Sequence, residues 1–521
     1  MNPANPNAVL DSDAPLVSPD GAKKNSYGQI LKSSSIIGGA QGINYLIGMV
    51  RTKLVAVLLG PSGVGLVGLY VSATELVGTI AGLGLDSSGV REVAEAHGSG
   101  DAGRVARTVK TLRRVCWVTG ILAWLLTAAL SYPLSVWTFG SGEQSWTIAI
   151  LGATLLLSAI SGGQRCLLQG TRRIGDLARL GILGAFVSTV CAVTLYAWLG
   201  KKGIVPVLLA TAAVNLGFSW WFARRIQTAR VTQDWLETLR NSKRLVHLGL
   251  AFMYGAVLAA VFALTIRAFI VREFGLDANG IYQAAWGISG MFAGFIMTAM
   301  GTDFYPRLTA VAHDNGQVNR LVNEQIEIGL LLALPGIIGT LAFAPWLIQV
   351  FYSAKFLPAA DLLPWLAIGI FGQVITFPLG YIQRAKGKVG WIILSQSHLN
   401  LLHLALALIL IRVYGVVAAA WAFALTTYFH GLVVFGIAHR LSEFTLAKSS
   451  VQLAFSAVGL IGVGFAAQMF AHRLLEFGLG VIVMTATSLF CLRGIASRLG
   501  AAHRIVKMAL KFPGGRFACG L

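Results

Sequence analysis

The sequence predicts an all-α polytopic membrane protein. Fourteen apolar stretches of about 20 residues follow one another between Ser33 and Ser497, with short polar segments between them. A helix of about that length crosses the roughly 30 Å hydrocarbon core of a bilayer, where unpaired backbone groups are not tolerated. Hydrophobic residues make up 56% of the chain and charged residues 12%. A soluble domain carries about twice that share of charge, which excludes a soluble fold.

The fourteen predicted spans form two pseudo-symmetric six-helix bundles and two extra C-terminal helices. Where one span ends and the next begins is predicted to within about four residues. The last two spans are the least secure, because glycines at 456–464 and the pair His472 and Arg473 interrupt them, so we expect twelve to fourteen crossings. In chain order the predicted spans are 33–58, 66–90, 115–138, 146–166, 178–199, 205–223, 245–272, 280–304, 328–351, 362–384, 391–413, 417–438, 450–471 and 474–496.

These spans divide the chain into six units. Polar, proline-containing residues at the start and basic residues at the end lack the apolar content of a packed core, so both ends are predicted to be cytoplasmic tails. The units are a disordered tail (1–27), an N-terminal half (28–226), a cytoplasmic linker (227–244), a C-terminal half (245–440), an extra helix pair (450–496) and a basic tail (497–521).

The net charge of +20 is distributed unevenly across the predicted membrane. With the N-terminus inside, most Lys and Arg residues fall in cytoplasmic segments, as the positive-inside rule requires. The basic clusters are therefore topology signals, and we expect no nucleic-acid partner. The far side carries only Lys201, Lys202, Arg272, Lys355, Arg412 and Arg473.

The chain repeats itself with an offset of 215 or 216 residues. Arg51 precedes a turn that starts at Gly60, and Arg267 precedes a similar turn that starts at Gly275. An even number of spans separates the copies, so both have the same orientation. Parallel repeats related by an axis along the membrane normal are a transporter architecture, and we expect the binding site in the cleft between the halves.

A polar stripe in the first span supplies candidates for that site. Gln41, Asn44 and Arg51 recur at helical spacing and share one face. Arg51 and Arg267, opposed across a cleft, would present bidentate forks to a diphosphate. Two other readings stay open: polar groups that only hold helices together, and arginines that extend to the interface.

Glu75 lies in the middle of the second span, where a carboxylate is costly. It could neutralise Arg51, or it could titrate and couple transport to an ion. Further cations are expected at the cytoplasmic mouth, and two explanations fit them. They could contact an anionic headgroup, or they could only follow the positive-inside rule. These are Arg165, Arg172, Arg173, Arg384 and Lys386.

Nothing in the sequence indicates an active site. There is no phosphate-binding loop, no HExxH motif and no Cys/His set with metal-ligand spacing, so we expect no catalytic residue, no metal and no cofactor. The cysteines are expected to be free thiols. A glycan polymerase or ligase would be expected to have a large far-side loop, and every predicted far-side loop is short.

Three motifs resemble polysaccharide flippases of the O-antigen (Wzx) type. They are the run from Gly60 to Tyr70, the run from Gln164 to Ala178, and the turn from Ala385 to Lys388. These flippases belong to the multidrug/oligosaccharidyl-lipid/polysaccharide exporter superfamily, which also holds MATE exporters and lipid II flippases. The resemblance covers residues 28–440. Such proteins commonly have twelve spans, so the extra helix pair departs from the family pattern. The long N-terminal tail is a second departure.

The resemblance implies a transporter rather than an enzyme. It would move undecaprenyl-diphosphate-linked oligosaccharide repeat units from the cytoplasmic to the periplasmic leaflet by alternating access, for O-antigen or exopolysaccharide biosynthesis. Its implied location is the bacterial inner membrane, with membrane lipids, a polysaccharide polymerase and a chain-length regulator as partners. The alternative is an ion-coupled multidrug or metabolite exporter of the same fold. Such an exporter would use a titratable acid, and Glu75 could be that residue.

Overall fold

The computed structural model describes residues 19–226, 229, 231–470 and 473–499. All regular structure in these residues is helical, which confirms the predicted fold class. Each of the fourteen predicted spans coincides with all or part of a helix. The helices are α1 (Pro19–Ala81), α2 (Leu85–Gly98), α3 (Ala102–Ala129), α4 (Ser131–Phe139), α5 (Ser145–Gly170), α6 (Ile174–Leu199), η1 (Gly200–Gly203), α7 (Ile204–Ala223), α8 (Trp235–Ala310), α9 (Asn315–Phe351), η2 (Ala354–Asp361), α10 (Leu363–Ala385), α11 (Val389–Tyr414), α12 (Ala418–Ser442), α13 (Lys448–Phe470) and α14 (Arg473–Leu499).

Among the described residues, eleven helical segments are long and apolar enough to cross a membrane. Three of them, Gly39–Ala81, Ile174–Ala223 and Met253–Gly294, contain 43, 50 and 42 residues. At 1.5 Å per residue, such a segment is about 65 Å long, roughly twice the hydrocarbon thickness. Each is therefore long enough for two crossings, which would accommodate the fourteen predicted spans.

Single glycines form the turns inside α1 and α8. Gly60 has φ 65° and ψ −176°, and Gly275 has φ 84° and ψ 177°. Only glycine adopts this region without strain, because a Cβ atom would collide with the backbone. The two turns lie 215 residues apart, which is the offset of the sequence repeat.

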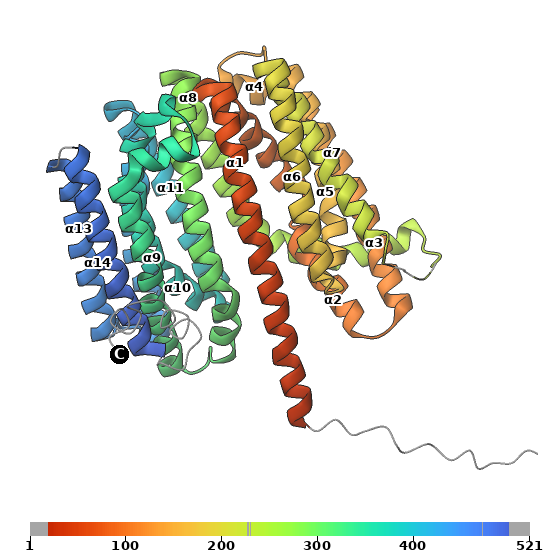
Figure 1. Ribbon diagram of the computed structural model, residues 1–521. Helices are drawn as coiled ribbons and strands as arrows, with labels where there is room; N and C mark the ends of the chain where they lie inside the picture. The colour runs from red at the N-terminus through yellow and green to blue at the C-terminus, as the bar shows by residue number, and fades with distance from the viewer. Residues whose placement is uncertain (1–18, 227–228, 230, 471–472, 500–521) are drawn as a thin grey trace, which may run out of the picture.

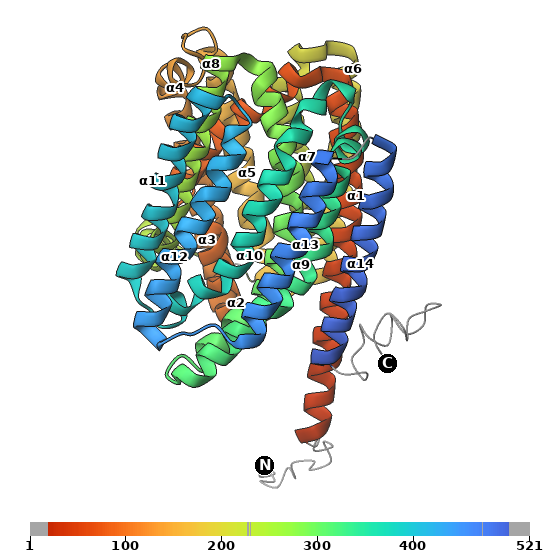
Figure 2. The same ribbon diagram turned by 90° about the vertical axis from the view of Figure 1, so that its left-hand side faces the viewer.

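The helices form two bundles that stand side by side (Figure 1). The N-terminal half comprises α1 to α7, and the C-terminal half comprises α8 to α12 with α13 and α14 on its outer side. The turned view in Figure 2 shows α13 and α14 along α9. Buried Leu, Ile, Phe and Ala side chains from α9 and its neighbours form the largest apolar core of the C-terminal half.

The two halves meet closely at the far end, next to the two glycine turns. Any Cβ on Gly65 would overlap the Leu276 carbonyl oxygen, and any Cβ on Gly280 would overlap the Pro61 carbonyl oxygen. The amide of Asn279 donates a 2.8 Å hydrogen bond to the Gly65 carbonyl. Gly65 and Gly280 are also 215 residues apart, so equivalent backbones of the two repeats touch each other.

Two basic side chains connect the halves near the same end. The ammonium of Lys53 in α1 donates to the Gln349 carbonyl in α9, and the guanidinium of Arg272 in α8 donates to the Val136 carbonyl in α4. Both carbonyls belong to the last turn of a helix, where the helix dipole favours a cation. We call these two contacts the far-side latches.

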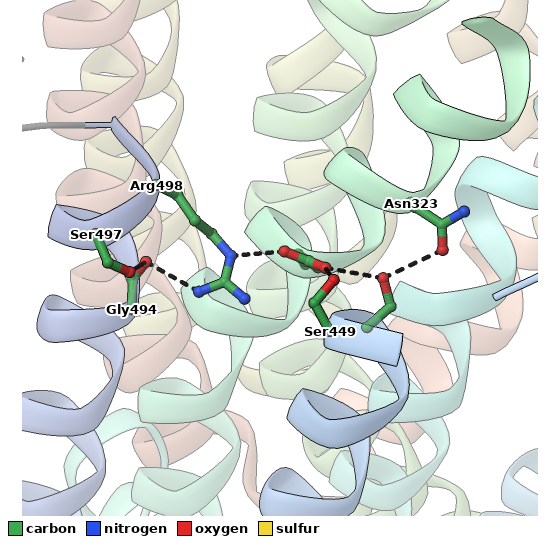
Figure 3. Close-up of polar contacts among 7 residues, drawn as sticks. Asn323, Ser449, Gly494, Ser497 and Arg498 are labelled. Carbon is green, nitrogen blue, oxygen red and sulfur yellow. Dashed lines mark hydrogen bonds and ion pairs between the residues drawn. The ribbon is translucent and has the colours of Figure 1, made fainter. Parts of the chain in front are cut away.

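The extra helix pair is attached to α9 by a polar cluster at one end (Figure 3). Glu327 of α9 accepts hydrogen bonds from Arg498 of α14, at 2.6 Å, and from Ser449 and Ser450 of α13. Ser450 also donates to Asn323, one turn earlier on α9, at 3.1 Å. The pair is therefore part of the C-terminal bundle.

The structure corrects several predicted boundaries. The second span was predicted to reach residue 90, but its helix ends at Ala81, because Leu83 and Gly84 adopt positive φ angles and α2 starts anew. The third predicted span, 115–138, is divided at Leu130 into α3 and α4. Pro133 lies in the first turn of α4, where its missing N–H is tolerated.

The two terminal units and the linker lie partly outside the described residues. Helix α1 already begins at Pro19, so the end of the segment predicted as a disordered tail is helical. Helix α8 begins at Trp235, inside the predicted linker. Residues 1–18 and 500–521, which hold the rest of both predicted tails, lie outside the described part of the chain.

Candidate functional site

A cavity of about 470 Å³ lies inside the C-terminal half, between α8, α10, α11 and α12. We call it the C-half cavity. Its only charged lining side chains in the described part of the chain are Arg267 and Arg384. Polar and aromatic side chains line the space between them. They are Tyr282, Trp286, Gln373, Thr376, Tyr381, Gln383, Ser395, Gln396, Asn400, His403, Thr426, Thr427 and His430.

Helical spacing places these polar groups on the cavity wall. On α10, Gln373, Thr376, Gly380 and Gln383 recur at steps of three, four and three residues, which keeps them on one face. On α11 and α12 the polar residues recur in the same way. Sequence reasoning considered such stripes only in the first two spans and therefore missed these three. The same periodicity rule would have found them.

Arg267 is almost fully buried, with 9% of its surface exposed, at the boundary of the two halves. Its Nη1 donates a 3.1 Å hydrogen bond to the Gly68 carbonyl of α1. A Cβ on Gly68 would lie 3.0 Å from Nη1, so the glycine leaves room for the guanidinium. Glu75 is close enough to interact favourably with this charge. A buried cation held mainly by one carbonyl keeps donors available for an anion.

Arg384 lies at the other end of the C-half cavity, one residue before the end of α10, and is exposed. Its guanidinium carbon lies 5.0 Å from the centre of the Tyr381 ring, a cation–π geometry. Arg384 was predicted as a contact at the cytoplasmic mouth, and Arg267 as part of a central clamp. The structure brings both to one cavity.

The N-terminal half contains a different cavity, of about 310 Å³, which we call the N-half cavity. Glu75 and Asp86 line it together with Arg165 and Thr79. Glu75 is exposed. The two cavities thus differ in charge, because carboxylates line the N-half cavity whereas the described lining of the C-half cavity contains none.

The other residues predicted for the clamp lie elsewhere. Arg51 donates a 3.5 Å hydrogen bond to the Thr211 hydroxyl of α7, within its own half. Asn44 packs against α6 at Gly181, where a Cβ would lie 3.0 Å from its amide nitrogen. Gln41 is exposed on α1. The structure therefore directs Arg51 and Arg267 to different partners.

Two of the remaining cations predicted at the mouth make local contacts. Arg173 forms an ion pair with Asp176 at 3.5 Å, and Lys386 donates a 2.7 Å hydrogen bond to Asn315. Arg172 is exposed in the turn between α5 and α6, with φ 56°.

Comparison with known proteins assigns a family. The model of the polysaccharide biosynthesis protein family matches residues 30–312, more than half of the chain. The chain belongs to this family. It is 23% identical to the lipid III flippase of Escherichia coli (strain K12) over 387 residues, which cover 73% of this chain and 91% of that protein.

Solved structures show the same fold. The lipid II flippase MurJ in an inward closed conformation has a TM-score of 0.67 at 13% identity, with 89% of this chain and 99% of that chain covered. An inward-facing MATE family multidrug transporter of the MOP superfamily has a TM-score of 0.64 at 14% identity, with 77% and 95% covered. These matches confirm the fold that the resemblance to this exporter superfamily implies. The chain is a multi-pass membrane protein of polysaccharide biosynthesis.

Proposed function

We propose that this chain flips lipid-linked glycan, specifically undecaprenyl-diphosphate-linked oligosaccharide repeat units, from the cytoplasmic to the periplasmic leaflet. The observation that carries the proposal is the C-half cavity, which has amide and hydroxyl groups among apolar side chains, an arginine at each end and no carboxylate in its described lining. Such a site favours a diphosphate and disfavours a cationic drug. The names of the relatives and the family description support a glycan cargo.

The direction of transport follows from the charge distribution and the far-side contacts. Basic residues at one end of the bundle support an orientation in which that end, and the N-terminus, face the cytoplasm at a bacterial inner membrane. At the opposite end the halves touch through Gly65, Gly280 and the far-side latches. In this state the substrate enters from the cytoplasmic side, and alternating access requires these contacts to separate.

Each predicted site residue has a role in this scheme. Arg384, with Arg165, Arg172, Arg173 and Lys386 around the mouth, attracts the anionic headgroup, and Arg267 holds the diphosphate deeper in the protein. Arg51, Gln41 and Asn44 bind from the N-terminal half once the halves rearrange, and Glu75 couples the cycle to an ion. The lipid tail stays in the bilayer, and the product passes to a polymerase and a chain-length regulator.

Genetic complementation tests the proposal. The gene is deleted in the native host and replaced by wild type, Arg51→Ala or Arg267→Ala, and surface polysaccharide and lipid-linked sugar on each leaflet are measured. We expect lipid-linked sugar to accumulate in the cytoplasmic leaflet after deletion, and the wild-type gene to restore its transfer to the periplasmic leaflet. Unchanged surface glycan after deletion, in a host without a second flippase, would refute the proposal.

The N-half cavity supports a second candidate, an ion-coupled multidrug or metabolite exporter. Glu75 and Asp86 in one cavity are groups that could bind a cation or a proton. Efflux of a cationic dye from whole cells distinguishes the two functions. Efflux that depends on Glu75, together with normal surface glycan after deletion, would favour the exporter.

A further inference from the structure

We infer that the C-half cavity is a subsite for the sugar next to the diphosphate, a ring that bears hydroxyl and acetamido groups. The inference rests on the proposed function and adds the part of the substrate that this half recognises. Its basis is a set of amide and hydroxyl groups between Arg267 and Arg384 that the described protein does not engage.

The amides of Gln373 and Gln396 line the cavity, and neither makes a side-chain hydrogen bond within the described part of the chain. A side-chain amide offers two donors and an acceptor. A sugar hydroxyl or acetamido group is both donor and acceptor, so it can use all of these sites. An aliphatic drug would leave them unpaired, which is costly in a water-poor cavity.

Three further residues of the cavity lining carry buried polar atoms. Gln383 and Thr426 are 2% and 1% exposed, and Gln383 Oε1, Thr426 Oγ1 and His430 Nδ1 are buried with no hydrogen-bond partner in the described chain. Most buried polar atoms in folded proteins are paired. Three unpaired atoms around one cavity therefore indicate a ligand that supplies the missing partners after small rotations of these side chains.

Helix-to-helix adhesion does not explain the set. Within the described part of the chain, only one hydrogen bond among these amide and hydroxyl groups joins two helices, the 2.8 Å bond from Gln383 to Ser395. Asn400 and Thr427 donate to carbonyls of their own helices instead. Groups whose purpose was adhesion would pair with one another across the helix contacts.

The size and charge of the cavity limit the ligand. Its volume of about 470 Å³ is within the range of small-molecule sites, about 300–1,000 Å³. It therefore holds the sugar nearest the lipid rather than a whole repeat unit. Tyr282 and His403 stack on the Trp286 ring at 5.8 and 6.4 Å, so recognition depends on hydrogen bonds more than on an open aromatic face.

Binding to the purified full-length protein in lipid nanodiscs tests the inference. The two probes are undecaprenyl diphosphate and undecaprenyl diphosphate that carries one N-acetylglucosamine. The test variant is Gln373→Leu combined with Gln396→Leu, and its control is Gln452→Leu, an exposed position on α13. A second matched pair is Thr426→Val and Thr487→Val, which both remove a buried unpaired hydroxyl, but only Thr426 lines the cavity.

We expect wild type to prefer the sugar-bearing lipid. The double variant should lose about 5- to 150-fold in affinity for that lipid, since each neutral hydrogen bond is worth about 2- to 12-fold and the variant removes bonds from two side chains. It should bind the bare diphosphate unchanged, and both controls should match wild type. Thr426→Val should remain as stable as wild type and lose part of the preference.

Three results would overturn the inference in distinguishable ways. Equal wild-type affinity for both probes would remove the sugar subsite and leave the proposed function standing. An equal loss for both probes in the double variant would assign the amides to the diphosphate or to the fold. If wild type binds neither probe, the proposed function itself fails.

Discussion

The guanidinium of Arg267 donates a 3.1 Å hydrogen bond to the Gly68 carbonyl, across the boundary between the two halves. Arg51, its counterpart in the sequence repeat, donates to Thr211 within its own half. The repeat therefore places two arginines at equivalent positions but gives them different partners. This difference makes the two sites separable by mutation.

Substitution of Arg267 should impair glycan transport more than substitution of Arg51. We expect Arg267→Ala to lose about 10- to 150-fold in affinity for undecaprenyl diphosphate, because hydrogen bonds to charged groups are worth about 1.5–3 kcal/mol. Arg267→Lys should recover only part of it, since an ammonium lacks the bidentate fork. Binding in nanodiscs provides the measurement, and equal losses for Arg51→Ala and Arg267→Ala would contradict the asymmetry.

Alanine at Gly65 or Gly280 should open the far side. The added Cβ would overlap backbone of the opposite repeat, which cannot rotate away as a side chain could. Pulsed electron paramagnetic resonance between spin labels at Lys202 and Lys355, which are both exposed, measures the separation of the halves. Gly290→Ala is the control, because nothing lies within 4 Å of its Cβ position. An unchanged distance in both test variants would refute the close contact.

Removal of a far-side latch should also shift the equilibrium between the closed and the open far side, but by less than alanine at Gly65 or Gly280. Lys53→Gln and Arg272→Gln each lose one exposed cation–carbonyl contact between the halves. Exposed charged contacts contribute about 0.2–1 kcal/mol, so we expect a shift of roughly twofold for each. The spin-label distances report it, and the double variant should show the sum. Arg412→Gln, exposed on α11, should show none.

Glu327→Ala should loosen the extra helix pair. It leaves Arg498, Ser449 and Ser450 without their shared acceptor, and we expect a loss of about 1.5–3 kcal/mol in local stability. The rate of limited proteolysis between α12 and α13 measures it. Glu324→Ala removes an exposed ion pair with Arg320 on the same helix and should cost at most about 1 kcal/mol. Equal proteolysis rates would show that the cluster does not hold the pair.

A decrease in pH should destabilise the N-termini of α3 and α9. Asp101 accepts hydrogen bonds from the backbone of Arg104 and Gly103, and Asp314 from that of Gln317, and these bonds lower the pKa of both carboxyls. A carboxyl whose pKa is lower in the folded state than in the unfolded state stabilises the fold. This stabilisation is complete above the unfolded-state pKa, about 3.9, and is lost as the pH falls through the folded-state pKa. Thermal melts from pH 6 to pH 3 should therefore show a smaller acid-induced decrease for Asp101→Asn combined with Asp314→Asn. An identical decrease in wild type would contradict these roles.

Much of the fold could be predicted from the sequence because a bilayer imposes a single length scale. Apolar stretches of membrane-spanning length predicted the all-helical polytopic fold, and the 215-residue offset predicted the equivalent turns at Gly60 and Gly275. Helix breaks were less predictable, because the end of α1 at Ala81 depends on backbone angles at Leu83 and Gly84 that no apolar pattern encodes.

The candidate site was predictable only in part. The sequence identified Arg267 and Arg384 as unusual cations, because a charge in or near hydrocarbon costs free energy whatever its neighbours are, and such residues are therefore often functional. It assigned them to different sites, and it passed over Gln373, Gln396 and Thr426, which are ordinary residues one at a time.

The sequence by itself determined the helical membrane fold and the repeat, which depend on composition and local periodicity, and its motifs indicated the family. Only the tertiary structure decided that Arg267 and Arg384 share the C-half cavity, that Glu75 and Asp86 line another, and that Arg51 stands apart. The physical reason is that helical spacing fixes which residues share a face, whereas the packing of α8, α10, α11 and α12 fixes which faces meet.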